Sequence, residues 1–228
     1  MTNICFIAPW GTPENLLARF KNQTPDSSGE WNSVRGVADP EQADCLVVLD
    51  AMGEKGVCKR LNLNNLDKYS IIHLRTEPDF ISRFSPIPGS RFQDYSNGTV
   101  RSCTWWIKSS YDELVSMEYY KKSKLLSSVV SPKWKHRNIF LKNLSKIMKF
   151  DAYGGPRLKD IVGRNYMHPL PPGQNKEEGI TDYSFSIALE NSAQRNCFTE
   201  KAIDCLLLWT LPIYWGCPNM GEFFPQYS

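Results

Sequence analysis

The stretch that decides the fold is FSIALENSAQRNCFTEKAIDCLLLWTLPIYWG, residues 185–216. An apolar run over residues 183–189 predicts a buried strand, and the run over 211–215 predicts another. Between them, residues 199–209 predict a helix opened by a Thr199 cap. Strand, helix and strand in this order predict a βαβ unit with parallel strands and a right-handed crossover.

The same alternation of short apolar runs and amphipathic segments extends over the rest of the chain. Further strands are predicted at residues 4–8, 44–50, 69–74, 99–107, 125–130 and 150–153. Further helices are predicted at 11–20, 111–117, 136–149 and 158–162, and a proline-rich loop at 168–179. This rhythm predicts an α/β fold with parallel strands covered by helices. We place a lobe boundary so that residues 1–115 form one lobe and residues 116–228 the other.

Composition excludes several classes of protein. The chain has 228 residues, 41% of them hydrophobic and 22% charged, as in an ordinary globular protein. A net charge of +3 is too small to indicate nucleic acid or an anionic membrane as a partner. We find no leader pattern and no apolar run of about 18 residues, so we expect no signal peptide and no membrane span.

The cysteines and histidines point to a reducing compartment and to no metal site. The seven cysteines are odd in number and scattered, and they contain no C-x-x-C pair, which indicates a reducing compartment. Since we also expect no signal peptide and no membrane span, we expect a cytoplasmic location. The three histidines are not spaced with cysteines as metal ligands would be, and the sequence contains no D-x-D motif. We therefore expect no metal and no cofactor.

The end of the predicted strand 183–189 and the start of the next helix carry the candidate chemistry. A lysine in a first helical turn is disfavoured by the helix dipole, so Lys201 suggests an anion nearby. A nucleotide diphosphate would suit, with Lys201 at the pyrophosphate and Glu200 at the ribose hydroxyls. A plainer interpretation makes Glu200 a first-turn acid and Lys201 a solvated side chain. The candidate donor-binding residues here are Glu190, Asn191, Ser192, Thr199, Glu200 and Lys201.

The motifs F-S-I-A-L-E-N-S, T-E-K and L-P-I-Y-W-G closely resemble the donor-binding signature of the α-1,3-fucosyltransferases, glycosyltransferase family 10. The family separates the Asn and the Lys by ten residues, as Asn191 and Lys201 are separated here. The likeness extends over roughly residues 125–225 and is loose over the first 120. It implies a GT-B fold, with two Rossmann-like lobes and the nucleotide-sugar site in the cleft. Residues 1–115 would then form the acceptor-side lobe and residues 116–228 the lobe that binds the donor. The likeness also implies an enzyme that transfers fucose from GDP-fucose, its donor substrate, to a hydroxyl of a glycan acceptor with inversion.

The resemblance also implies roles for single residues. Lys201 matches the lysine at the donor phosphates, Glu200 the acid that holds the ribose, and Asn191 the amide beside the nucleotide. Arg137 matches the phosphate-binding arginine, a task that the guanidinium fork suits because it can bind two oxygens at once. The alternative is that Arg137 is one more basic residue in a helix with Lys142, Lys146 and Lys149.

Two departures from the family pattern leave other functions open. Cys197 stands where the family usually has a tyrosine, four residues before the lysine, which favours another sugar nucleotide as an alternative donor. The chain stops at Ser228, where the family continues. Either this is a minimal member or a closing segment is missing, and a non-catalytic module that binds a nucleotide sugar or a glycan is a further alternative.

The catalytic base is expected in the N-terminal lobe. An inverting transfer needs a carboxylate to take the proton of the acceptor hydroxyl. Glu77, just beyond the predicted strand 69–74, is the first candidate, and the resemblance places the family's base in a comparable loop. Glu77 could instead pair with Arg75 or cap the turn at Pro78. Asp50 is the second candidate for the base and Asp79 the third.

Overall fold

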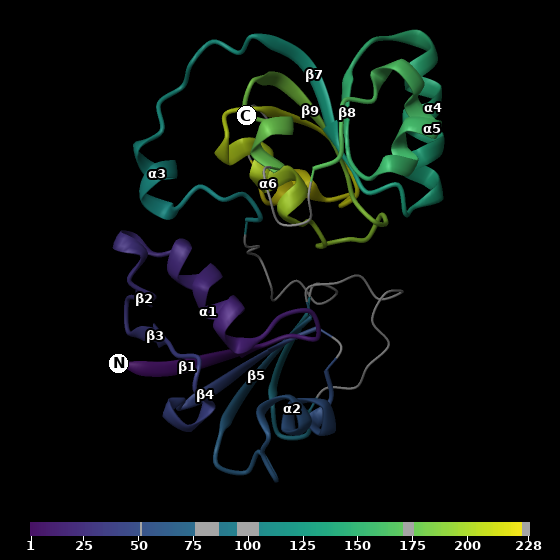
Figure 1. Ribbon diagram of the computed structural model, residues 1–228. Coiled ribbons are helices and arrows are strands. Elements are labelled where there is room, and N and C mark those ends of the chain that lie inside the picture. The colour runs from purple at the N-terminus through teal and green to yellow at the C-terminus, as the bar shows by residue number, and fades with distance from the viewer. Residues whose placement is uncertain (51, 76–86, 95–104, 171–175, 225–228) are drawn as a thin grey trace. The chain divides into compact units, whose positions relative to one another are not determined.

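The computed structural model describes residues 1–50, 52–75, 87–94, 105–170 and 176–224, and the chain divides into two compact units (Figure 1). Unit 1 comprises Met1–Ser102, Ser109–Ser116 and Arg195–Cys197. Unit 2 comprises Cys103–Lys108, Met117–Gln194 and Phe198–Ser228. Within the described residues, no helix has the length and the apolar character that crossing a membrane requires.

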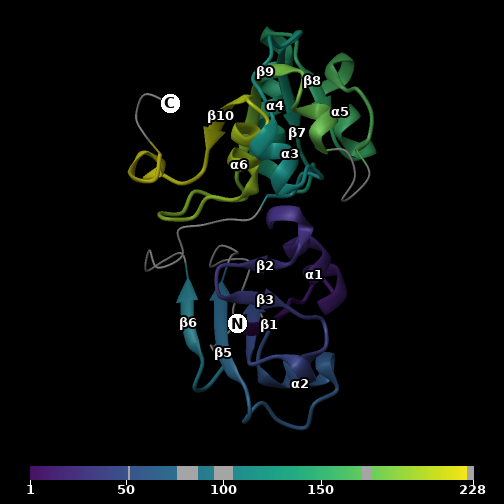
Figure 2. The same ribbon diagram turned by 90° about the vertical axis from the view of Figure 1, so that its left-hand side faces the viewer.

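Unit 1 is built on a six-stranded sheet with strand order β2-β3-β1-β4-β5-β6. Neighbouring strands pair in parallel, except for the antiparallel pair β2 and β3. Figure 2 shows β5 and β6 side by side in the same direction. The strands are β1 (Thr2–Ile7), β2 (Glu30–Trp31), β3 (Val34–Gly36), β4 (Cys45–Leu49), β5 (Ser70–Arg75) and β6 (Arg91–Asp94). The helices are α1 (Pro13–Asn22), α2 (Glu54–Leu61) and α3 (Tyr111–Ser116).

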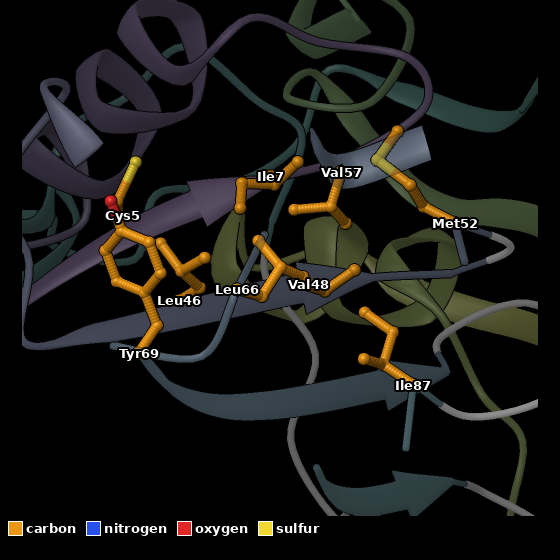
Figure 3. Close-up of a cluster of buried hydrophobic side chains, with 9 residues drawn as sticks. All are labelled: Cys5, Ile7, Leu46, Val48, Met52, Val57, Leu66, Tyr69 and Ile87. Atoms are coloured by element: carbon orange, nitrogen blue, oxygen red, sulfur yellow. The ribbon is translucent and has the colours of Figure 1, made fainter. Parts of the chain in front are cut away.

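Helices cover both faces of this sheet. Successive side chains of β1 point to opposite faces, so their contacts show which helix lies on which face. Cys5 and Ile7 belong to a buried cluster that includes Val57 of α2 (Figure 3). On the other face, the ring of Phe6 lies 5.2 Å from that of Phe20 in α1, measured between centroids. Helix, sheet and helix layers of this kind are Rossmann-like.

Unit 2 is built on a four-stranded sheet with order β10-β9-β7-β8, in which every pair is parallel. Its strands are β7 (Lys124–Val129), β8 (Asp151–Tyr153), β9 (Tyr183–Leu189) and β10 (Leu211–Trp215). Its helices are α4 (Lys135–Ile147), α5 (Lys159–Val162) and α6 (Glu200–Leu207), with a 3₁₀ turn at Lys176–Gly179 before β9.

The connections of unit 2 create a topological switch point between β7 and β9. From β7 the chain passes through α4 to β8, and from β9 it passes through α6 in the opposite direction to β10. Right-handed crossovers place α4 and α6 on opposite faces, as Figure 1 shows. The side chains of β9 agree, since Ile187 clusters with Leu141 of α4 while Ser186 lies beside Cys205 of α6. Ligands of open α/β sheets bind at the carboxyl ends of the strands that flank such a point.

The structure confirms the predicted strands 183–189 and 211–215 and corrects other predictions. Within the predicted strand 99–107, residues 105–107 are not a strand, because the backbone N–H of Trp106 donates to Asp204 Oδ1 (2.8 Å); the remainder lies outside the described residues. Helix α2 was not predicted, since its residues have one buried side chain, Val57, and an internal Gly56. Strand β6 was not predicted either, because R-F-Q-D is short and half charged.

Candidate functional site

A buried glutamate at the end of β9 joins the conspicuous motifs of unit 2. The Glu190 carboxylate accepts hydrogen bonds from the backbone N–H (2.7 Å) and the hydroxyl (2.8 Å) of Thr199. It also accepts one from the Tyr214 hydroxyl (3.4 Å), and the ammonium of Lys201 lies 3.2 Å from its Oε2. Thr199 occupies the N-cap position of α6, but its hydroxyl does not cap the helix as predicted, because it is bound to Glu190.

The motif Y-W-G at the end of β10 is shaped by the same glutamate. A Cβ atom at Gly216 would clash with Cβ and Cγ of Glu190, so only glycine leaves room for this side chain. The Tyr214 hydroxyl accepts the N–H of Cys217 (3.0 Å) while it donates to Glu190. The three motifs that are separate in sequence therefore meet in one structure around Glu190.

Lys201 is enclosed by polar groups of the chain itself. Its ammonium donates to the Thr199 hydroxyl (2.8 Å) and lies 3.3 Å from Glu200 Oε1, and the side chain is 20% exposed. Burial lowers the pKa of Lys201, but Glu200 and Glu190 raise it more, so the pKa ends above its ordinary value. Two carboxylates thus account for a lysine at a helix start, and its position alone does not require an external anion. It is not the solvated side chain of the plainer interpretation either.

Glu200 stays ionised far into the acid range. Burial raises its pKa, but the ammonium groups of Lys201 and Lys176 and a hydrogen bond from Thr199 lower it more, to about 2. The two ammonium groups lie 3.3 Å and 3.8 Å from Glu200 Oε1. Because the side chain is 23% exposed, the carboxylate can still reach a ligand.

Arg137 comes from α4 to the same place, across the switch point from α6. The guanidinium donates from Nε to the carbonyl oxygen of Glu190 (3.1 Å) and from Nη2 to Oδ1 of Asn191 (2.5 Å). These bonds engage two of its five N–H donors. Burial lowers the pKa of Arg137, and Glu190 and Glu200 partly offset this effect. Arg137 is 3% exposed, whereas the other basic side chains of the predicted helix, Lys142, Lys146 and Lys149, are exposed, so Arg137 is not one more solvated cation.

Ser192, at the tip after β9, has a buried hydroxyl oxygen with no hydrogen-bond partner among the described residues. A buried hydroxyl of this kind costs free energy unless a water molecule or a ligand binds it. The tip therefore combines the amide of Asn191, which is bound to Arg137, with a hydroxyl that needs a partner.

Two further residues of the site were not predicted. Lys176, from the 3₁₀ turn before β9, lies 2.5 Å from Oδ2 of Asp204, which is fully buried in α6. The spacing of Glu200 and Asp204 could have revealed an acidic pair on one face of the helix, because residues four apart are neighbours. Lys176 could not have been found in this way, since it lies 28 positions before Asp204 in sequence.

Of the three candidates for the catalytic base, only Asp50 lies within the described residues. Asp50, just after β4, is buried; its carboxylate accepts the indole N–H of Trp10 (3.3 Å), and its backbone has a left-handed φ of 56°. The His73 ring donates from Nε2 to the Asp50 carbonyl oxygen (2.9 Å), because Nδ1 accepts the N–H of Ile87. Glu77 and Asp79 lie outside the described residues, so the choice of base stays a prediction.

The fold and the site define the class of protein. Two parallel sheets layered with helices are the elements of the GT-B fold, and one sheet carries charged residues at its switch point. Over 97% of this chain and 70% of the other, the structure resembles the crystal structure of an α1,3-fucosyltransferase with GDP, with 20% identity and a TM-score of 0.50. This likeness confirms the predicted fold class. The predicted cleft between the lobes stays a prediction, as does the assignment of lobes to acceptor and donor.

The second half of the chain also resembles known proteins in sequence. Residues 119–228 match the family model for glycosyltransferase family 10 (fucosyltransferase), C-terminal part. An α-(1,3)-fucosyltransferase FucT of Helicobacter pylori is 33% identical over 88 residues, which are 39% of this chain and 16% of the relative. An α-(1,3)-fucosyltransferase B of Drosophila melanogaster is 29% identical over 94 residues, 40% of this chain and 21% of the relative. The predicted resemblance is confirmed, and the matched stretches span about a fifth or less of these relatives.

The depressed pKa of Glu200 predicts an acid-dependent contribution to stability. Its pKa falls from 4.5 to about 2 on folding, so the contribution is complete above pH 4.5 and is lost as the pH falls toward 2. We expect the difference in melting temperature between the wild type and Glu200→Gln to stay level from pH 6 to about pH 5 and then to shrink toward pH 3. The matched control is Glu118→Gln, at an exposed glutamate that lies far from the charged groups around Glu200 in sequence. A difference that stays constant over this range would contradict the assigned cause.

Proposed function

We propose that the chain acts as an inverting glycosyltransferase that moves a fucosyl group from GDP-fucose to a hydroxyl of a glycan acceptor, without a divalent metal. The observation that carries the proposal is the convergence of Arg137, Glu200 and Lys201 at the switch point of unit 2, within the region that matches family 10. The names of the curated relatives and the GDP in the solved structure of like fold support the choice of donor. A cytoplasmic location belongs to the same proposal, and the six described cysteines are free.

The diphosphate would bind by exchanging contacts with the cationic side chains. An ammonium group has three N–H donors, and those of Lys201 are directed at Thr199, Glu190 and Glu200. Glu200 is the more exposed of the two carboxylates, at 23% against 4% for Glu190, so a phosphate oxygen would replace its contact at the least cost. Arg137 would add donors of its fork, and the N-terminal N–H groups of α6 would add their partial positive charge.

The same exchange would prepare Glu200 for the sugar of the nucleotide. Once the phosphate takes the Lys201 contact, the Glu200 carboxylate would be free to accept hydrogen bonds from the ribose hydroxyls. Asn191 and Ser192, at the tip after β9, would line the nucleotide, with the Ser192 hydroxyl gaining the partner that it lacks. The cations would then stabilise the charge that develops on the departing GDP, which is the role that a metal ion has in other transferases.

A carboxylate from unit 1 would complete the reaction. It would take the proton from the acceptor hydroxyl as the oxygen attacks the anomeric carbon and the bond to the diphosphate breaks. We assign this role to Glu77, with Asp50 as the second candidate. The alternative proposal is a transferase of the same architecture with another sugar nucleotide as its donor, because Cys197 stands where family 10 usually has the larger tyrosine. GDP-mannose and UDP-sugars are therefore titrated beside GDP-fucose.

Substitution Lys201→Ala should weaken GDP and GDP-fucose binding, and it should also lower the melting temperature because it removes the cation beside the buried Glu190 carboxylate. Losing one charge-assisted contact to phosphate in a partly buried site should cost about 2–3 kcal/mol, or one to two powers of ten in affinity. Titration calorimetry measures the loss, and near-ultraviolet circular dichroism checks the fold. Lys142→Ala, at an exposed lysine of α4, is the control for net charge. Unchanged GDP affinity in a folded Lys201→Ala protein would refute the donor site.

Substitution Glu77→Gln should slow turnover about 10²–10⁴-fold with little change in donor affinity, because a general base acts in the chemical step. Arg137→Ala should instead weaken the binding of GDP and GDP-fucose alike. Turnover is measured as GDP release with and without EDTA, and we expect no effect of EDTA on the wild type. Near-normal turnover of Glu77→Gln would move the base to Asp50 or Asp79.

The same assay tests the proposal that the reaction needs no divalent metal. Activity that EDTA abolishes and Mn²⁺ restores would refute it.

A further inference from the structure

We propose that Lys176 is a positioning residue that holds Glu200 in place for the ribose, and that Asp204 anchors Lys176 in turn. The inference rests on the proposed function, since it assumes that the ligand is a nucleotide. It assigns selectivity for the ribose to a group of three charges, Lys176, Glu200 and Asp204, rather than to Glu200 alone.

The geometry of α6 creates the need for a cation. Glu200 and Asp204 are four residues apart, so their carboxylates lie on one face of the helix and repel each other. The ammonium of Lys176 reaches both, at 2.5 Å from Asp204 Oδ2 and 3.8 Å from Glu200 Oε1. It comes from the 3₁₀ turn before β9, outside the helix, and neutralises the repulsion.

Asp204 is a fixed anchor for this lysine. Its carboxylate is fully buried, and its Oδ1 accepts the backbone N–H of Trp106 (2.8 Å). One oxygen is thus tied to the backbone while the other holds Lys176. Because both oxygens of Asp204 are bound, its carboxylate has a fixed position. The Lys176 ammonium that it binds is therefore also held in a fixed position beside Glu200.

The two ammonium groups reach Glu200 on the same oxygen. The ammonium groups of Lys201 and Lys176 both lie nearest Oε1. We therefore assign Oε2 as the oxygen that accepts a ribose hydroxyl. When a phosphate takes over Lys201, Lys176 is the cation that keeps Glu200 charged and oriented. Loss of Lys176 should then affect recognition of the ribose more than recognition of the phosphates.

The test compares the binding of GDP, 2′-deoxy-GDP and 3′-deoxy-GDP by calorimetry. The wild type should bind GDP about tenfold or more tightly than the analogue that lacks the contacted hydroxyl, as a hydrogen bond to a charged group implies. Glu200→Gln should abolish this preference, and Lys176→Met should reduce it at least about threefold. Lys176→Arg, which keeps the charge, should retain most of it. Lys142→Met makes the same charge change on the exposed face of α4 and should change nothing.

A second variant covers the case in which Lys176→Met does not fold. That substitution leaves Asp204 buried without a cation, and the double variant Lys176→Met/Asp204→Asn removes this charge as well. The proposal predicts that the folded double variant has also lost the ribose preference. A folded variant that keeps the wild-type preference would overturn it and leave the donor site standing. A wild type that binds no GDP would instead refute the proposed function, and one that binds all three nucleotides equally would refute the role of Glu200.

Discussion

A single buried carboxylate organises unit 2. Glu190 follows the last residue of β9, and its oxygens accept the N–H and the hydroxyl of Thr199 at the start of α6 and the hydroxyl of Tyr214 in β10. Its carbonyl oxygen accepts a hydrogen bond from Arg137 of α4. A carboxylate can be buried only when such partners replace the water it loses. The positions of α6 and β10 relative to the end of β9 are therefore fixed by the need to satisfy this carboxylate, and α4 is tied to the same residue through its carbonyl oxygen.

The same constraint produces a site that is balanced in charge without a ligand. Among the described residues around the switch point, the cations Arg137, Lys176 and Lys201 face the anions Glu190, Glu200 and Asp204. An anionic ligand would not fill a vacant positive site; it would displace carboxylates from cations that already have partners. Ordered partners also explain how long side chains such as Lys201 and Arg137 can be held ready, since their conformational freedom is lost on folding rather than on binding.

The layout of unit 2 could be predicted from sequence because the apolar run of β9 is bounded by polar residues on both sides, and that of β10 by Thr210 before it and Gly216 after it. The donor-side residues could be named because they sit in short motifs at strand and helix ends. The predictions that were wrong or missing concern contacts between segments that are distant in sequence. The Thr199 hydroxyl was predicted to cap its own helix, but a carboxylate nine residues away binds it instead. The contact of Lys176 with Asp204 has no local signal in the sequence, and neither has the packing of Tyr214 and Gly216 against Glu190. In each case the partners lie more than 20 and up to 28 residues apart.

The central claim is that the charged cluster around Glu190 binds a nucleotide diphosphate by exchanging contacts. A crystal structure of the protein with GDP tests it most directly. The account predicts that phosphate oxygens lie about 3 Å from the Lys201 ammonium and the Arg137 guanidinium, that Lys201 has left Glu200, and that Glu190 still holds Thr199. GDP bound elsewhere, or bound with the contact between Lys201 and Glu200 unbroken and no phosphate near Arg137, would contradict it.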